Sequence, residues 1–340
     1  MTISAKSWAA KLGPYRQGND KRSWFELALT TFAFLASWAL AYYLYFISLW
    51  LALPAVLIAA GFLVRMFMLQ HDCGHNSLFG SRKLNDWVGR VIGLLTLTPY
   101  DYWRHSHAMH HASSGNLDRR GMGDITTLTV EEYQQLSFGG RVKYWLYRNP
   151  FVLFVIGPIY IFMIQQRLPF ESFRQGRSSW LGVLGTNFGL LMIALIGGYF
   201  LGFGPFFMVH LPIVFFGAAA GVWLFYVQHQ FDETHWKRNE DWSHETAALN
   251  GSSYYDLPQP FKWFSGNIGI HHLHHLSSRI PFYRLPEVLR DYPELADVGR
   301  LTFVQSLVCI KLVLWDEAAE KLVSFREARM AQSMRLAPAE

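Results

Sequence analysis

The chain has 340 residues, of which 51% are apolar, 16% aromatic and 16% charged, with a formal net charge of +5. A soluble domain usually carries about 25% charged residues, so this composition favours a chain that is solvated partly by lipid. The modest positive charge comes without a Gly-rich phosphate loop or an aromatic-interleaved basic patch, and it gives no indication of nucleic-acid binding. Two cysteines, Cys73 and Cys309, form no disulfide framework and suit a reduced compartment.

Two long stretches, residues 23–64 and 178–236, contain no Lys or Arg. Each is long enough to cross a bilayer twice, because one crossing needs about 20 residues. We divide the first near residues 48–54 and the second at the Gly-Phe-Gly-Pro run of residues 202–205, where Gly and Pro interrupt a helix. The sequence therefore predicts two membrane hairpins, with helices at about 25–47, 51–70, 181–202 and 206–228.

All 30 basic residues lie outside those two stretches, and the two inter-helix turns carry none. The positive-inside rule then places both termini and the remaining sections, residues 71–180 and 229–340, on the cytosolic side. We predict an all-α integral membrane protein in which these sections form one helical cap, and we treat residues 1–340 as a single domain.

Three further segments outside the membrane helices have an interpretable pattern. The apolar runs at residues 91–99 and 151–164 are shorter than a membrane span, so we expect them at the interface or beneath the membrane helices. Residues 302–330 show helical periodicity with charges on one face. We expect a cytosolic amphipathic helix there.

The chain contains 14 histidines, and three clusters hold most of them. Residues three and four apart share one face of a helix, so each cluster can direct two or three imidazoles to one locus. All three clusters fall on the predicted cytosolic side. The in-phase residues are His71, His75, His107, His110, His111, His271, His274 and His275.

The other histidines are interpreted individually. His105 and His272 are out of phase with their clusters and should be structural or supporting. His229 lies where the fourth helix leaves the bilayer and faces the same compartment as the clusters, although a lone histidine there is more often structural. His210, inside the predicted fourth membrane helix, is expected to be structural. The two remaining histidines, His235 and His244, should lie at the surface or behind the ligands.

Eight in-phase imidazoles exceed what one ion binds, since zinc sites close at four ligands, and they imply two metal ions. Imidazole suits zinc, copper, iron and nickel, so ligand type alone does not select the metal. The setting favours iron. The site lies directly beneath a lipid-facing bundle that an acyl chain can enter, and O2 chemistry at an unactivated C–H bond needs a redox metal. We expect two iron ions, with O2 as co-substrate.

Imidazole ligands bring no negative charge, so carboxylates should orient the rings and offset the charge of the metals. Asn267, four residues before His271, could meet a metal directly or through water. The candidate carboxylates are Asp72, Asp101, Asp118, Asp124, Asp232 and Asp241.

The three clusters resemble the HxxxH, HxxHH and HxxHH boxes of the integral-membrane fatty acid desaturases. Similar flanking residues are Gln70 before the first box, Trp103-Arg104 before the second and Gly269-Ile270 before the third. The run Leu-Ser-Ser-Arg-Ile-Pro-Phe-Tyr-Arg-Leu-Pro at residues 276–286 resembles the segment that follows the third box in bacterial and cyanobacterial acyl-lipid desaturases of the Δ12 type. The resemblance covers about residues 25–300.

This resemblance implies a four-helix membrane fold with a cytosolic cap, in a bacterial inner membrane, and nine histidine ligands to two irons, with His229 as the ninth. The implied reaction introduces a cis double bond, of the Δ12/ω-6 type, into a fatty acyl lipid, acyl-CoA or acyl-ACP. Electrons should come from a ferredoxin or a b-type cytochrome, because the sequence has neither a His-Pro-Gly-Gly haem motif nor a cysteine cluster. Trp223, Phe225 and Tyr226 on the fourth helix are expected to line the acyl tunnel.

Two alternatives stay open at this point. The same scaffold can be a hydroxylase or ketolase acting on alkanes, carotenoids or sphingolipids, and only the products distinguish it, although the flanks of the third box favour a desaturase. A metal transporter would need polar ligands at mid-membrane depth, and the predicted helices offer almost none apart from His210.

Overall fold

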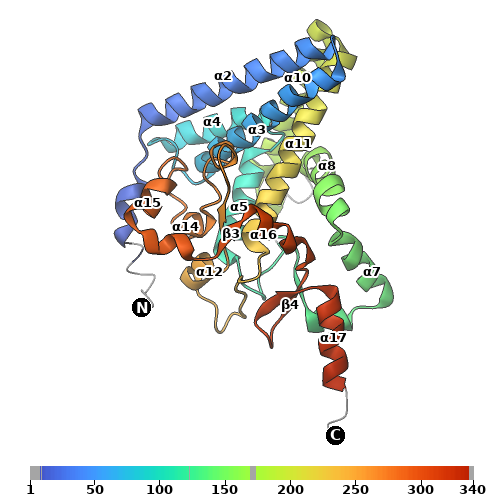
Figure 1. The fold of residues 1–340 in the computed structure, drawn as a ribbon. Coiled ribbons are helices and arrows are strands. Elements are labelled where there is room, and N and C mark those ends of the chain that lie inside the picture. The colour runs from blue at the N-terminus through green and yellow to red at the C-terminus, as the bar shows by residue number, and fades with distance from the viewer. Residues whose placement is uncertain (1–7, 9, 122, 169–173, 337–340) are drawn as a thin grey trace.

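A computed structural model describes residue 8 and residues 10–121, 123–168 and 174–336. Four long apolar helices form a bundle above a cap of short elements (Figure 1). Each of the four is long and apolar enough to cross a membrane, which confirms the predicted all-α membrane fold. They are α2 (Asp20–Tyr45), α3 (Leu49–Gly74), α10 (Arg177–Leu201) and α11 (Phe203–His229).

The two hairpins turn where the sequence breaks. Gly202, with a φ of 82°, separates α10 from α11, a backbone conformation that glycine adopts without steric cost. In the first hairpin, α2 ends at Tyr45 and α3 begins at Leu49, so the break falls slightly before the predicted one. Because α3 continues to Gly74, beyond the predicted end near residue 70, His71 lies in its last turn.

Within the bundle, α3 is the most buried of the four helices. Small side chains at Ala52, Ala55, Ala59 and Ala60 are all buried and let neighbouring helices approach closely. At Gly217 of α11, an added Cβ would lie 3.1 Å from Leu63 and 3.4 Å from the carbonyl oxygen of residue 60. This close approach fixes α11 against α3.

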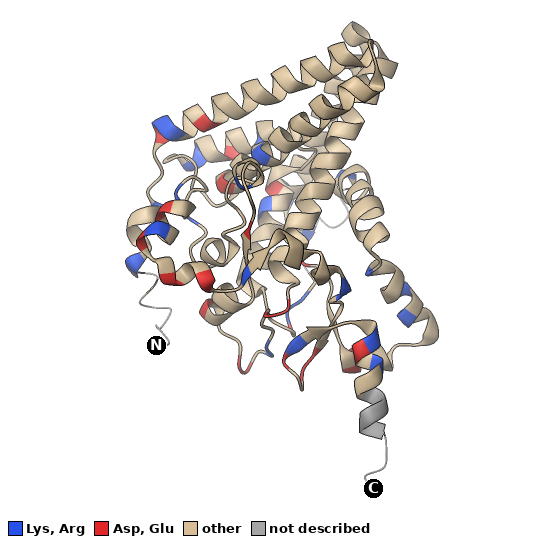
Figure 2. Cartoon of the chain, in the orientation of Figure 1, with Lys and Arg blue, Asp and Glu red and all other residues tan. Residues whose placement is uncertain are grey.

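Charged side chains lie mostly on the cap and at the cap-side ends of the long helices, whereas the far end of the bundle is nearly free of them (Figure 2). The cap is assembled from short helical elements that precede, separate and follow the membrane hairpins. They are η1 (Gly13–Arg16), α4 (Arg82–Leu95), α5 (Tyr100–Ser113), α6 (Val130–Gln135), α7 (Phe138–Tyr147), η2 (Val152–Ile156), α8 (Gly157–Met163), η3 (Gln165–Arg167), α12 (His244–Asn250), α13 (Phe261–Phe264), α14 (His271–Leu276), α15 (Leu285–Asp291), η4 (Pro293–Asp297), α16 (Phe303–Ser306), η5 (Val308–Lys311) and α17 (Phe325–Leu336).

Two short sheets, which were not predicted, join distant parts of the cap. In one, β1 (Leu128–Thr129) pairs in parallel with β4 (Leu314–Asp316), which pairs antiparallel with β5 (Lys321–Val323). In the other, β2 (Tyr254–Asp256) pairs in parallel with β3 (Arg300–Thr302). They tie the C-terminal section to the segments that follow α5 and α11.

The prediction of one amphipathic helix over residues 302–330 is wrong, because the segment divides into α16, η5, the β4–β5 hairpin and the start of α17. Of the charges assigned to a helix face, Lys311 ends η5, and the others belong to the hairpin: Asp316, Glu317, Glu320 and Lys321. Asp316 accepts hydrogen bonds from the backbone N–H groups of residues 318 and 319, and Glu320 has a φ of 49°. Leu314 and Trp315 are buried beneath the turn, so burial of β4 outweighs the helical pattern.

The two short apolar runs lie on elements with exposed apolar side chains. Val91 is exposed on α4, as are Ile156 and Ile159 along η2 and α8. The segments Phe138–Tyr147 and Val152–Arg167 together are apolar enough to be a membrane span but bend by 60° between them. Their placement at the membrane interface stays a prediction.

Candidate metal centre

The histidine clusters are carried on helix ends that meet where the bundle joins the cap. The last turn of α3 carries His71, with His75 directly after it, and His229 is the last residue of α11. The second and third boxes lie on α5 and α14, whose short helices put offsets of three and four on one face. The nine rings gather in two groups.

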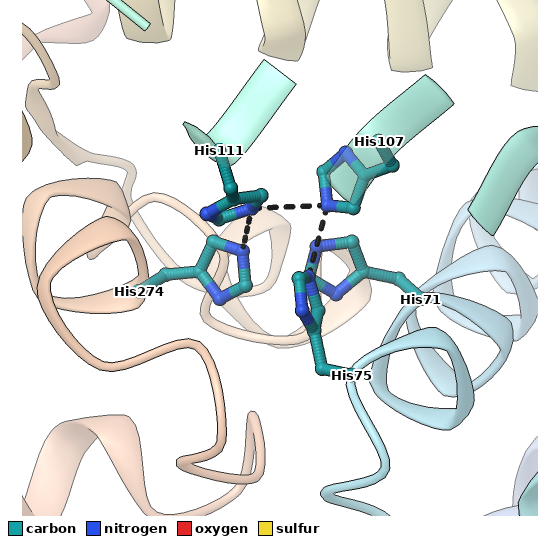
Figure 3. Close-up of side chains that lie close together, drawn as sticks. All are labelled: His71, His75, His107, His111 and His274. Carbon is teal, nitrogen blue, oxygen red and sulfur yellow. Dashed lines mark hydrogen bonds between the residues drawn. The ribbon is translucent and has the colours of Figure 1, made fainter. Parts of the chain in front are cut away.

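The first group contains five imidazoles, and their ligand nitrogens all lie within 4.8 Å of one another (Figure 3). The Nε2 atom of His107 lies 3.0 Å from Nε2 of His75 and 3.1 Å from Nε2 of His111. The Nε2 atom of His274 lies 3.0 Å from that of His111. The ring of His71 completes the group, with its centroid 4.4 Å from that of His274.

The second group contains four imidazoles, all buried, from α5, α11 and α14. The Nε2 atom of His229 lies 3.1 Å from Nε2 of His110 and 3.0 Å from Nε2 of His271. The Nε2 atom of His275 lies 3.1 Å from that of His271. The two groups adjoin, since the rings of His111 and His275 stack with centroids 4.1 Å apart.

Burial favours the neutral form of the five rings on α5 and α14 whose pKa it lowers. Burial lowers the pKa of His271, His274 and His275 on α14 well below its usual value, and the neighbouring imidazoles lower it further. The same two causes lower the pKa of His107 and His111 on α5. A neutral imidazole keeps one ring N–H and one lone pair, and the lone pair is what a metal binds.

The donor set fits a metal, as the positions of two ring protons indicate. His110 donates through Nδ1 to Asp124, and His229 donates through Nδ1 to the carbonyl oxygen of Gly251 at 3.2 Å. In the neutral form of both rings, the two Nε2 atoms then carry lone pairs that lie only 3.1 Å apart. Facing lone pairs repel each other unless a cation lies between them, and imidazole ligands held by an outer Nδ1 hydrogen bond are typical of metal sites.

Two of the predicted carboxylates contact the histidines. Asp124 accepts the hydrogen bond from His110, and Asp72 lies with Oδ1 3.1 Å from Nδ1 of His71. The other oxygen of Asp72 accepts the backbone N–H of Phe282 at 2.7 Å. Asp72 therefore connects the first box to the segment that follows the third.

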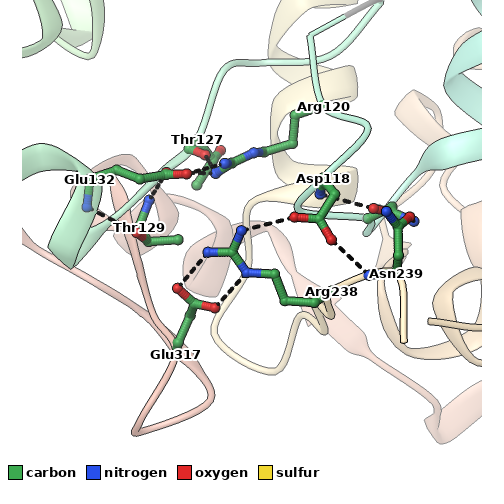
Figure 4. Close-up of polar contacts among 9 residues, drawn as sticks. Asp118, Arg120, Thr127, Thr129, Glu132, Arg238, Asn239 and Glu317 are labelled. Carbon is green, nitrogen blue, oxygen red and sulfur yellow. Dashed lines mark hydrogen bonds and ion pairs between the residues drawn. The ribbon is translucent and has the colours of Figure 1, made fainter. Parts of the chain in front are cut away.

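The other predicted carboxylates lie elsewhere. Asp101 forms a bidentate pair with Arg90, and Asp118 pairs with Arg238 on the cap surface, where Arg238 also holds Glu317 (Figure 4). The two remaining candidates, Asp232 and Asp241, are both exposed. Among the described residues, none of these four carboxylates hydrogen-bonds to a histidine of either group.

Asn267 has a different position from the one that its spacing indicated. It precedes α14 in a turn, with a φ of 56°, so the helical offset to His271 does not apply. Its amide Nδ2 donates to the carbonyl oxygen of Phe282 at 3.2 Å. Asn267 and Asp72 thus hold the same residue of the loop after α14.

The five histidines that were not predicted to bind metal lie outside both groups. His272 is buried and donates through Nε2 to the carbonyl oxygen of residue 295 at 2.9 Å, and His105 is exposed. His210 stacks on Phe206 within α11. The remaining two, His235 and His244, are half-buried and exposed, respectively.

Two aromatic rings lie against the groups, each four residues before a histidine on the same helix. Trp103 stacks on His107 with centroids 4.6 Å apart. Phe225 lies 5.1 Å from His110 and 5.2 Å from His229. The sequence pointed to both residues only as flanking or tunnel-lining positions. Their helical spacing to these histidines was the signal for the contacts.

Four membrane helices above a buried histidine cluster define a membrane protein with a site able to hold metal ions. A model of the family described as fatty acid desaturase matches residues 48–306. A fatty acid desaturase from Bacillus subtilis is 41% identical over 321 residues, which cover 94% of this chain and 91% of that protein.

Two further relatives are more distant. An endoplasmic-reticulum omega-3 fatty acid desaturase from Vigna radiata is 30% identical over 245 residues, 66% of this chain and 60% of that protein. An sn-1 acyl-lipid omega-3 desaturase (ferredoxin) from Synechocystis is 29% identical over 230 residues, 65% of this chain and 61% of that protein. The chain thus matches about three fifths of the length of these two relatives.

The chain belongs to the fatty acid desaturase family, as the sequence predicted. Membership makes it a membrane oxidoreductase of lipid metabolism, and the two histidine groups are its metal-capable site. The family also argues against the metal-transporter alternative.

Proposed function

We propose that the chain is a fatty acyl desaturase that uses O2 and two electrons at a di-iron centre to introduce a cis double bond into an acyl chain. The observation that carries the proposal is the pair of adjacent histidine groups at the cap-side ends of α3 and α11. An acyl chain in the bilayer has only a short path to such a site.

The proposed ligands divide between the two ions as the rings divide between the two groups. Bound there, the irons would supply the redox chemistry by which O2, two electrons, two protons and the two hydrogens removed from adjacent methylenes become two waters. The first group is His71, His75, His107, His111 and His274, and the second is His110, His229, His271 and His275.

The protein's own residues hold this site ready. Asp124 accepts a hydrogen bond from Nδ1 of His110, and Asp72 lies 3.1 Å from Nδ1 of His71. An Nδ1–H on each ring would leave its Nε2 lone pair directed inward. Phe225, one turn from the cap-side end of α11, covers the second group from the membrane side and helps to exclude water. Fixed ligands matter because ångström-scale positioning of the acyl chain decides which bond reacts.

The proposed substrate is an acyl lipid, as in the name of the Synechocystis relative, and the proposed electron donor is an external ferredoxin, with a b-type cytochrome as the second choice. The run at residues 276–286 is the basis for proposing Δ12 regiochemistry, although two of the relatives are named as omega-3 desaturases. The absence of Lys and Arg from both inter-helix turns supports cytosolic termini and a cytosolic cap in a bacterial inner membrane. Residues 1–340 are proposed to act as a single desaturase domain.

The test is fatty acid profiling, by gas chromatography with mass spectrometry, of a bacterial host without a desaturase that expresses this chain and a ferredoxin. We expect a new double bond, whose position the spectrum gives. His110→Ala should abolish it, while His105→Ala, which alters an exposed histidine outside both groups, should not. Unchanged fatty acids from folded, metal-loaded protein would contradict the proposal, and hydroxylated or oxidised alkanes, carotenoids or sphingolipids would identify a hydroxylase or ketolase.

A further inference from the structure

The segment that was expected to be a cytosolic amphipathic helix begins with an apolar face turned outward. Phe303, Val304, Leu307 and Val308 are 49%, 73%, 48% and 57% exposed. Their offsets of one, four and five residues place them on one side of a helical turn. We name these four residues the 303–308 face. An exposed apolar patch of this kind marks an interaction site rather than ordinary surface.

The opposite side of the same segment is turned inward and carries Ser306, whereas the exposed Gln305 caps the helix by accepting the backbone N–H of Thr302. The hydroxyl of Ser306 lies 3.0 Å from that of Tyr255, which accepts the Nε1–H of Trp223 at 3.3 Å. The carbonyl oxygen of Cys309 accepts the hydroxyl of Tyr226 at 3.0 Å. A surface helix in water turns its apolar side chains inward and its polar side chains outward. Here Ser306 is hydrogen-bonded on the inner side and four apolar side chains face outward, an arrangement that suits a lipid environment.

The depth of the segment follows from its partners on α11. Trp223 and Tyr226 lie six and three residues before His229, the last residue of that helix. At 1.5 Å per residue they are about 4.5–9 Å farther from the cap than His229. The segment that carries the 303–308 face therefore lies beside the last two turns of α11, as the position of α16 beside the lower end of that helix also indicates (Figure 1).

A second apolar surface adjoins the same end of α11. The ring of Phe154 in η2 lies 5.3 Å from that of Tyr226, and the next helix, α8, exposes Ile159 and Tyr160. At the other end of the 303–308 face, Lys311 is exposed and can meet a lipid phosphate. Apolar side chains beside a membrane helix with a cation at the edge match the layers of a bilayer boundary.

We propose that the 303–308 face inserts into the bilayer, where phospholipid acyl chains cover its four side chains. The segment then anchors the C-terminal part of the cap to the membrane. Because β3, α16 and η5 pack around Tyr226 and Tyr255, the anchor holds the cap beside the second histidine group at a fixed depth. This inference does not depend on the identity of the metal or of the product.

The test measures the depth of single labels on the full chain in vesicles of phosphatidylcholine and phosphatidylglycerol. A fluorophore is attached at Val304→Cys or, as a second site on the same face, Val308→Cys; the native Cys73 and Cys309 are buried and react poorly. Quenching is compared for lipids brominated on their acyl chains and for aqueous iodide. Reference labels are Leu191→Cys on α10, 54% exposed toward lipid, and Glu294→Cys, exposed in the cap.

We expect both labels on the 303–308 face to be quenched by brominated lipid as Leu191→Cys is, and to resist iodide. Quenching by iodide as strong as at Glu294→Cys would overturn the proposal, because the face would then lie in water. Protection from both quenchers would also overturn it and would identify a protein partner, such as a second copy of the chain, as the occupant.

Discussion

Replacing Glu26 by Gln tests the buried ion pair that joins the first membrane hairpin. Glu26 on α2 and Arg65 on α3 are separated by 2.6 Å, and each side chain is only 2% exposed. Arg65 also donates to the carbonyl oxygen of Trp263 and lies 3.9 Å from the centroid of its ring. Since Trp263 belongs to α13, shortly before the third histidine box, the pair connects both helices of the hairpin to the cap.

The expected loss is large because the substitution leaves the guanidinium of Arg65 buried without its carboxylate. Removing one partner of a buried pair costs about 3–5 kcal/mol, whereas replacing both partners with apolar or neutral groups is often close to neutral. With about 2.1 cal/mol/K of unfolding entropy per residue, 340 residues give about 0.7 kcal/mol/K. The melting temperature should therefore fall by about 4–7 °C.

The assay is thermal unfolding in detergent or lipid nanodiscs, with two comparison variants. Arg22→Gln removes only the outer partner of Glu26, a side chain that is 54% exposed, and exposed pairs contribute about 0–1 kcal/mol. The double variant Glu26→Gln/Arg65→Met should melt above Glu26→Gln alone. The reasoning is refuted if Glu26→Gln melts within about 1 °C of Arg22→Gln, or if the double variant is the less stable one.

Two other predictions concern the metal site. Asp124→Ala removes the acceptor that fixes the ring of His110, so the metal affinity of the second group, measured by metal titration, should fall by about 10–100-fold. Asp118→Ala, which removes the contacts to Arg238 and to the backbone of Asn239 at the cap surface, should bind metal like the parent. Equal affinities for the two variants would contradict the assignment. Stripping the metal with a chelator should lower the melting temperature, because the lone pairs of His110 and His229 then face each other at 3.1 Å, and re-adding Fe(II) should restore it; a melting curve that is indifferent to the chelator would count against metal binding.

The sequence predicted the parts of the fold that depend on local pattern. Long apolar stretches without Lys or Arg favour membrane helices, and the four candidate spans α2, α3, α10 and α11 lie there. Offsets of three and four place histidines on one helix face wherever a helix forms, and this condition holds at the end of α3 and in α5 and α14. The histidine residues of the site could therefore be predicted from the sequence. Their division into two groups could not be predicted, because it depends on how the helices cross.

The carboxylates around the site were less predictable. Asp124 lies in an irregular loop, and nothing in its spacing to His110 distinguishes it from Asp118, which points to the surface and pairs with Arg238. Asn267 was chosen by helical spacing, but the helix begins only at His271. Side chains on turns are positioned by tertiary contacts, and local periodicity carries no information about those contacts.

The prediction of a helix in the C-terminal section was wrong for a related reason. A helix face and a hairpin turn both gather charged residues at short intervals, so the charges of residues 316–321 fit either structure. The burial of Trp315 decides between the helix and the hairpin. Its side chain is 1% exposed, and the residue pairs in β4 with both neighbouring strands. The partner strands lie at residues 128–129 and 321–323, and the first of these could not be foreseen from local sequence.

The site depends on the membrane bundle because each group is completed by a different membrane helix. The last turn of α3 supplies His71 only to the first group, and the end of α11 supplies His229 only to the second. Between them, α5 and α14 each contribute histidines to both groups. The close packing at Gly217 holds these two helices against each other. Packing within the bundle and the position of the two histidine groups are therefore connected through α3 and α11.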